Sequence, residues 1–284
     1  MSSSGGHWVW SASLRYVFMA LMLVVILFVQ GGINRIKDVL KLFLSNWQFW
    51  ILSGSIGFGA FYALICFSAD FSPGWVIAAT YQFTTVATLL VLMLFGRSFP
   101  KRVWIYALII FAGVCMVNLS RIDEFNLRVL VLGGFPVIIA AFCYPLGNQL
   151  VWEAKHGSHK RVPKIDSPLL TNVFNKVMLL TLGSFPLWII LILISQPPLP
   201  SYSQLLNTLL VALFSGIIGT SIFLYARNLA SNSSQIAGVD ATQSSEVVFA
   251  LIGGMVFLGK PIPNIISTIG LFLILGGLMM FVKY

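Results

Sequence analysis

Nine apolar segments of membrane-spanning length follow one another along the chain, and they constrain its fold more than any other feature. A helix that crosses the hydrocarbon core of a bilayer needs about 20 mostly apolar residues. The segments lie at residues 12–32, 48–68, 74–95, 103–120, 129–152, 169–195, 204–226, 235–258 and 264–282. Proline-rich punctuation, such as residues 196–200, falls between segments, where helices stop or start. The sequence therefore predicts an all-α integral membrane protein.

Composition agrees with a chain that lies almost wholly in the bilayer. Hydrophobic residues make up 58% of the chain and charged residues 9%, whereas soluble domains average about 45–50% and about 25%. The connections between segments are too short to hold a second domain. The formal net charge is +9. Nucleic-acid binding would need a basic face on a soluble domain, which this composition does not predict. We therefore expect lipid, and no nucleic acid, as a partner.

The distribution of the 17 lysines and arginines sets the predicted orientation. Most of them share alternate connections or the C-terminal end, namely Arg35, Lys37, Lys41, Arg97, Lys101, Arg102, Lys155, Lys160, Arg161, Lys164, Arg227 and Lys283. Arg121, Arg128 and Lys260 fall on the opposite side, and Arg15 and Lys176 lie inside segments. Because cytoplasmic loops carry the excess of positive charge, we expect a cytoplasmic C-terminus and an external N-terminus.

An internal repeat with an offset of 163 residues runs through the chain. The matched positions are Gly96, Arg97 and Pro100 with Gly259, Lys260 and Pro263, Gly113 with Gly276, and Tyr62-Ala63 with Tyr225-Ala226. The first four segments then correspond to the last four, and the segment at 129–152 has no counterpart. A repeat of five helices, an odd number, enters the membrane in opposite orientations in its two copies.

We therefore expect two inverted-topology repeats, residues 1–120 and 121–284, with nine helices present of an inferred ten. The first helix of the first repeat is missing in this interpretation. Residues 1–11 read like a loop between helices, which favours a shifted start codon or a deletion. A genuine nine-helix protein is the alternative.

Three stretches of the chain resemble known transporters. They are AGVDATQSSEVVF at 237–249, GHWVWSASLRY at 6–16 and PGWVIA at 73–78. The first is similar to a signature of the multidrug resistance efflux transporter family (EamA/EmrE-like), and two inverted five-helix repeats resemble its drug/metabolite transporter superfamily. The resemblance covers the whole chain and departs from the family by the missing helix. It implies a secondary transporter of the bacterial inner (plasma) membrane with a substrate cavity between the repeats.

Two of the eight carboxylates, Asp240 and Glu246, lie inside a predicted helix, with Gln243 between them at three-residue steps. On one helix these side chains would fan over about 120°. A carboxylate at bilayer depth can hold a proton or a cationic group of a solute but not both cheaply, which is the physical basis of proton-coupled antiport. In the alternative interpretation Glu246 pairs permanently with Lys176 and only joins helices.

Other polar side chains in the predicted helices are candidates for lining the cavity. They are Tyr81, Gln82, Thr85, Tyr144, Asn148, Trp152, Asn175 and Tyr225. Buried amides and hydroxyls also bridge helices without any role in binding. Arg15 and Lys176 are expected to reach the headgroups, or else to recognise an anion or pair with the acids.

Neither an enzyme nor an ATP-driven pump is indicated. The histidines His7, His156 and His159 all lie in connections, and the three cysteines sit in separate helices without metal-ligand spacing. We expect no metal and no cofactor. The sequence predicts a proton-coupled exporter of small organic solutes or drugs that works by alternating access. A narrower metabolite or amino-acid exporter and a truncated chain that does not transport are the alternatives, and a homodimer is among the expected partners.

Overall fold

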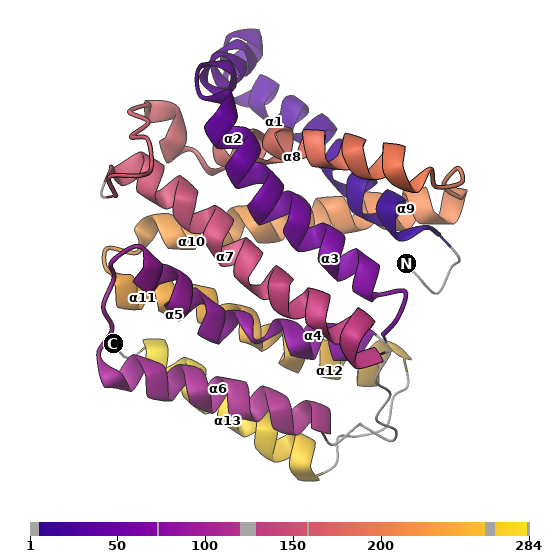
Figure 1. Cartoon of the computed structure of the whole chain (residues 1–284), viewed down its shortest axis with the longest axis vertical. Coiled ribbons are helices and arrows are strands. Elements are labelled where there is room, and N and C mark those ends of the chain that lie inside the picture. Colours follow the sequence, from indigo (N-terminus) through magenta and orange to yellow (C-terminus); the bar gives the residue numbers. More distant parts are fainter. Residues whose placement is uncertain (1–5, 73, 120–128, 158, 259–264, 283–284) are drawn as a thin grey trace. The chain divides into compact units, whose positions relative to one another are not determined.

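The computed structural model describes residues 6–72, 74–119, 129–157, 159–258 and 265–282, and the regular secondary structure in these ranges is entirely helical (Figure 1). The elements are α1 (Trp8–Ser45), α2 (Trp47–Gly54), η2 (Ser55–Ala60), α3 (Phe61–Ser68), α4 (Gly74–Tyr81), α5 (Thr84–Leu94), α6 (Lys101–Leu119), η3 (Val129–Gly134), α7 (Phe135–His156), η4 (Pro168–Thr171), α8 (Val173–Ser195), α9 (Tyr202–Val211), η5 (Ala212–Gly219), α10 (Thr220–Leu229), α11 (Ser233–Ala241), η6 (Thr242–Ser244), α12 (Ser245–Leu258) and α13 (Ile265–Val282). Each predicted segment contains one helix or several that follow one another closely. The prediction of an all-α protein is confirmed.

Five helical stretches among the described residues are long and apolar enough to cross a membrane. They are Trp8–Ser45, Trp47–Ser68, Val131–His156, Val173–Ser195 and Tyr202–Leu229, and Thr84–Leu94 and Thr268–Met280 are shorter apolar helices. Helices suit a bilayer because every backbone polar group is satisfied within the segment. The chain is a multi-pass membrane protein.

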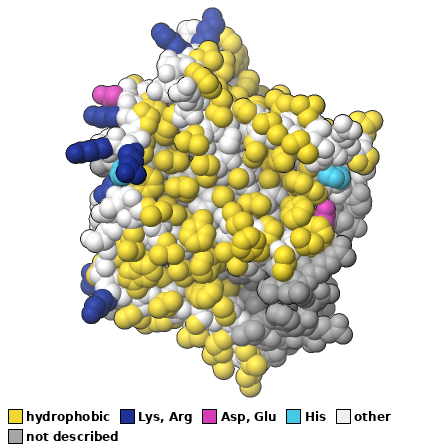
Figure 2. All heavy atoms as spheres, viewed as in Figure 1, with side chains coloured by type: hydrophobic (Ala, Val, Ile, Leu, Met, Phe, Trp, Pro, Cys, Tyr) yellow, Lys and Arg dark blue, Asp and Glu magenta, His cyan; other side chains and the backbone are white. Residues whose placement is uncertain are grey.

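The exposed surface of these helices is largely apolar, as expected for a protein that lies in lipid. Figure 2 shows hydrophobic side chains over most of the face in view. On α1, Leu21 is 61% and Val29 is 79% exposed, and on α8, Leu193 is 68% and Ile194 is 75% exposed. So much contiguous apolar surface would be unfavourable in water, whereas hydrocarbon solvates it.

The chain forms two compact units, and each takes helices from both halves of the sequence. Unit 1 comprises Met1–Asp70 and Leu146–Asn228, and unit 2 comprises Phe71–Pro145 and Leu229–Tyr284. The helix α7 therefore contributes its first part to unit 2 and its last part to unit 1. The repeats at 1–120 and 121–284 describe a relation along the sequence and stay a prediction.

In unit 1 the helices α1, α2 and α8 pack closely, and glycines set their separation. A Cβ atom added at Gly54 would lie 2.5 Å from the carbonyl oxygen of Leu180 on α8, and one added at Gly57 would lie 2.8 Å from the Cα of Gly147 on α7. Only glycine allows backbones to come so near. Around these crossings lie fully buried side chains such as Leu23 and Leu179.

In unit 2 the helices α6 and α13 lie side by side (Figure 1). A Cβ atom added at Gly113 would lie 2.6 Å from the carbonyl oxygen of Gly270. Val114, Val117 and Ile274 form a buried cluster beside this crossing. Two helices far apart in the sequence are thus joined along their small residues.

The end of the first predicted segment differs from the end of the corresponding helix in the structure. We placed the end of the first segment at residue 32, but α1 continues to Ser45 after a break at Gly31 and Gly32. Gly32 has a φ of 65°, which glycine adopts without strain. The charges of Arg35, Lys37 and Asp38 ended the hydropathy window there, although residues 33–45 also contain apolar side chains at helical spacing. A hydropathy window ends at such charges, whereas an amphipathic helix carries them on its polar face.

Candidate functional site

Two helices of unit 2 are interrupted within their apolar segments. The first breaks between α4, which ends at Tyr81, and α5, which begins at Thr84. The second breaks between α11 and α12, which the single 3₁₀ turn η6 joins. We expected continuous helices at 74–95 and 235–258, so this geometry was not predicted.

Hydroxyl side chains account locally for the interruption between α11 and α12. Thr242 Oγ1 donates to the carbonyl oxygen of Val239 (2.6 Å), and Ser245 Oγ donates to that of Thr242 (2.6 Å). Bonds from a side chain to the carbonyl three residues earlier compete with the regular α-helical ladder. The run of Thr, Gln and two Ser at 242–245 therefore favours a tight turn at this point.

The two interruptions contact each other through polar side chains. Tyr81 Oη donates to Gln243 Oε1 (3.3 Å), and the hydroxyls of Thr85 and Ser244 are 2.9 Å apart. Thr84 Oγ1 donates to the carbonyl oxygen of Ala141 on α7 (3.1 Å). A short 3₁₀ stretch inside a helix often marks a functional position.

The two predicted carboxylates lie on either side of the 3₁₀ turn. Asp240 is 1% exposed near the end of α11, and Glu246 is an exposed residue in the first turn of α12. Tyr81 interacts electrostatically with both carboxylates and with Tyr144. The structure thus brings six of the sequence-predicted residues together in unit 2, namely Tyr81, Thr85, Tyr144, Asp240, Gln243 and Glu246. Asp240, Gln243 and Glu246 do not share one continuous helix. Gln82 is also buried there and donates to the carbonyl oxygen of Ala78 on its own helix (3.2 Å).

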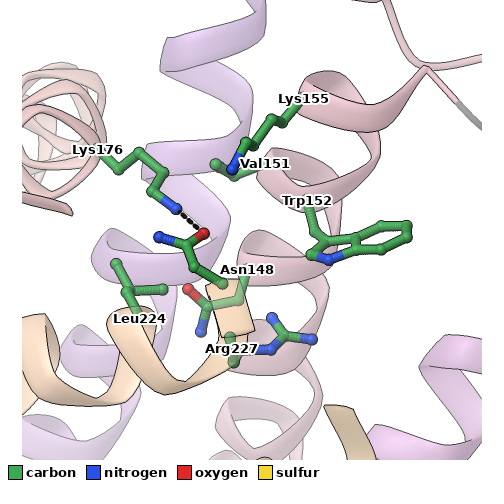
Figure 3. A pocket seen from close by; sticks show the side chains of 8 residues that line it. Asn148, Val151, Trp152, Lys155, Lys176, Leu224 and Arg227 are labelled. Atoms are coloured by element: carbon green, nitrogen blue, oxygen red, sulfur yellow. Dashed lines mark hydrogen bonds between the residues drawn. The ribbon is translucent and has the colours of Figure 1, made fainter. Parts of the chain in front are cut away.

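A second cluster of predicted residues lies in unit 1, around a small pocket. The residues that line it come from α7, α8 and α10 and are Asn148, Val151, Trp152, Lys155, Lys176, Leu224, Arg227 and Asn228 (Figure 3). Asn148, Trp152 and Lys176 were candidates from the sequence. Lys176 Nζ donates to Asn228 Oδ1. Its pairing with Glu246 stays a prediction.

Arg227 is a functional candidate that the sequence reasoning missed. We counted it among the charges of a cytoplasmic connection, yet it is 3% exposed and its Nη2 donates to Gln149 Oε1 (3.1 Å). Gln149 Nε2 donates in turn to Glu153 Oε1 (2.8 Å), and Glu153 is fully buried. A signal was available, because Gln149 and Glu153 are spaced by four residues on one helix and so form one polar stripe.

The remaining candidates lie elsewhere in unit 1. Asn175 is buried and its Nδ2 donates to the carbonyl oxygen of Leu169 (2.7 Å), which anchors the start of α8. Tyr225 is 58% exposed. Arg15, which we expected to reach the headgroups, is 6% exposed, and its guanidinium carbon lies 4.1 Å from the centre of the Tyr62 ring.

Comparison with known proteins gives these sites a family. A family model described as "Putative multidrug resistance efflux transporter" (EmrE) matches residues 1–284. The Bacillus subtilis (strain 168) protein named "Uncharacterized protein YjlA" is 36% identical over 296 residues, which cover 99% of this chain and 87% of that protein. The "Uncharacterized 42.1 kDa protein in intracellular alkaline protease 3'region" of Shouchella clausii is 34% identical over 238 residues, which cover 80% of this chain and 59% of that protein.

A solved crystal structure has the same fold, with a TM-score of 0.68 at 17% identity over 98% of this chain and 88% of the other. The family match extends along the whole length, as the resemblance of residues 237–249 led us to expect. The chain therefore belongs to the EmrE family of multidrug resistance efflux transporters, and is a multi-pass membrane transporter of small solutes.

Proposed function

We propose that this transporter is a secondary active exporter, which exchanges small organic solutes for protons by alternating access. The observation that carries the proposal is the contact of two interrupted helices in unit 2, with Asp240 and Glu246 on either side of the second interruption. A tight 3₁₀ turn inside a helix often marks a functional position, and here it brings hydroxyl, phenol and amide side chains together, which a solute or proton can use.

The coupling role falls to the carboxylates. A proton and a cationic group of the solute compete for the same carboxylate, so that binding of one favours release of the other. Because proton and solute bind in alternation, proton movement down its gradient drives solute export against the solute gradient. Tyr81 and Gln243 support such a site, since a phenol and an amide can donate to either the carboxylate or the solute.

Reconstituted vesicles with an imposed pH gradient test this proposal. The purified chain is expected to move at least one member of a panel of lipophilic cations and aromatic amino acids when the gradient is applied, and not when it is dissipated. Glu246→Gln keeps the shape of the side chain and removes its charge, so gradient-driven flux should fall by about 10²-fold, the size expected when a group that carries a proton is lost.

Asp38→Asn is the matched control, because Asp38 is an exposed carboxylate in the charged part of α1. It should leave the flux unchanged. Undiminished gradient-driven flux in Glu246→Gln and in Asp240→Asn would remove the coupling role from both carboxylates. Gradient-independent flux of the same solutes would show a transporter without proton coupling.

A further inference from the structure

The pocket of unit 1 is lined by three cationic side chains from three different helices. Lys155 comes from α7, Lys176 from α8 and Arg227 from α10, and none of the eight lining residues is acidic. Figure 3 shows the three side chains among the residues that line the pocket. The fold therefore brings these three positive charges together, although the three residues lie on helices that are far apart in the sequence.

Concentrating these charges is unfavourable unless something compensates them. Lys176 is 4% and Arg227 is 3% exposed, and both Lys155 and Arg227 act electrostatically on Lys176. Buried like charges lose hydration and repel one another, which is unfavourable in a low-dielectric setting. The buried Glu153, which accepts from Gln149, compensates at most one of the three positive charges.

The pocket also holds a buried amide that the described residues leave unused. Asn148 is 4% exposed, and neither its Nδ2 nor its Oδ1 has a hydrogen-bond partner in the described part of the chain. A buried amide in this condition carries a desolvation penalty that no hydrogen bond offsets. Because Asn148 lines the pocket, a ligand there can remove that penalty.

The donor set defines the chemistry of such a ligand. Arg227 presents a planar fork of N–H donors, the two lysines present ammonium groups, and Asn148 and Asn228 add amides. Carboxylate and phosphate oxygens accept from donors of this kind at short range. Trp152, whose ring stacks on that of His156 at 4.0 Å, provides a flat apolar wall for whatever carries the oxyanion.

We propose that this pocket of unit 1 binds a small oxyanion group, a carboxylate or a phosphate, between Lys155, Lys176 and Arg227, with Asn148 as a further donor. The proposal concerns unit 1 alone and does not depend on proton-coupled export. The oxyanion can belong to a soluble solute or to an anionic lipid headgroup.

Binding is measured on the purified full chain in a nonionic detergent. The midpoint of thermal unfolding is followed while inorganic phosphate or acetate replaces chloride at constant ionic strength. We expect phosphate, acetate or both to raise the midpoint above the value in chloride. Lys176→Gln and Asn148→Ala should each weaken the apparent affinity, and the loss of the charged donor should do so by about tenfold or more.

Lys160→Gln is the matched control, because Lys160 is an exposed lysine of the neighbouring connection that does not line the pocket. It should bind as the unchanged protein does. Lys155→Gln provides a further variant at a partly exposed position, which keeps the test decisive if removal of the buried Lys176 charge prevents folding.

The lipid source is tested in nanodiscs that contain either phosphatidylcholine alone or phosphatidylcholine with phosphatidylglycerol. Stabilisation and retention of phosphatidylglycerol in native mass spectra, lost in Lys176→Gln and kept in Lys160→Gln, would assign the pocket to a headgroup. Stabilisation by phosphate or acetate with the same pattern of variants would assign it to a soluble anion. If neither arm shows binding, or if the pocket variants bind as strongly as the control, the proposal is wrong.

Discussion

Arg15 is a charged residue packed inside a helix bundle, and its contacts explain how unit 1 tolerates it. Its Nη2 donates to Ser215 Oγ (3.1 Å), and the guanidinium lies over the ring of Tyr62. An arginine over an aromatic face is stabilised by about 0.5–2 kcal/mol, with the larger values where water is excluded. Tyr62 thus replaces part of the hydration that Arg15 loses.

Tyr62→Leu is expected to lower the stability of the protein for this reason. It removes the aromatic face and leaves Arg15 buried beside an aliphatic side chain, so we expect a loss of about 1–2 kcal/mol. Tyr225→Leu, at a tyrosine that is 58% exposed, should change stability by less than about 0.5 kcal/mol. Thermal unfolding of both variants in detergent measures the difference. Equal midpoints would show that the ring does not stabilise Arg15.

Close crossings between helices depend on pairs of glycines that the fold places opposite each other. Gly57 faces Gly147 in unit 1, and Gly113 faces Gly270 in unit 2. The internal repeat had paired Gly113 with Gly276, a relation along the sequence and not a contact. No Cβ fits at the two crossings, whereas a Cβ at Gly276 would meet nothing within 4 Å.

Gly57→Ala and Gly276→Ala should therefore have opposite effects. The first places a methyl group against the Gly147 backbone and should cost about 1–3 kcal/mol, the usual range for overpacking. The second adds no contact and reduces the freedom of the unfolded chain, so stability should rise by about 0.4–1 kcal/mol. Thermal unfolding of the two purified variants tests the pair. A destabilised Gly276→Ala would contradict the open space at that position.

For the whole molecule, the charge distribution predicts which connections face the cytoplasm. The connection after α7 carries Lys160, Arg161 and Lys164, whereas residues 196–201 between α8 and α9 carry no charge. The positive-inside rule predicts that the first connection is cytoplasmic and the second is external. This orientation also gives the cytoplasmic C-terminus that we infer.

Thiol labelling of whole cells tests the orientation. In a background with Cys66, Cys115 and Cys143 replaced by serine, Leu199→Cys should react with a membrane-impermeant maleimide from outside. Lys160→Cys should react only after the membrane is permeabilised. Leu199 is 91% exposed, so the reagent can reach it. The reverse labelling pattern would invert the predicted topology.

Parts of the candidate sites could be predicted from the sequence because charge at bilayer depth is conspicuous. Asp240, Glu246 and Lys176 were recognised for that reason, and Asn148 and Trp152 because polar or amphipathic residues recur at four-residue spacing. Arg227 was not recognised as a candidate, because a cation at the end of an apolar segment resembles a charge in a connection between helices. Tyr225, of the same residue type as Tyr81, lies exposed, because residue type does not say which face of a helix meets its neighbours.

Hydropathy alone establishes that the chain is a set of membrane helices. Segments of about 20 apolar residues can satisfy their backbone in lipid only as helices, and this holds whatever the segments pack against. The tertiary structure alone decided which residues meet. The interruptions at Tyr81 and η6 face each other, and Lys155, Lys176 and Arg227 surround one pocket. Such contacts join residues that are distant in the sequence, and they depend on the packing of side chains. No local sequence pattern predicts them.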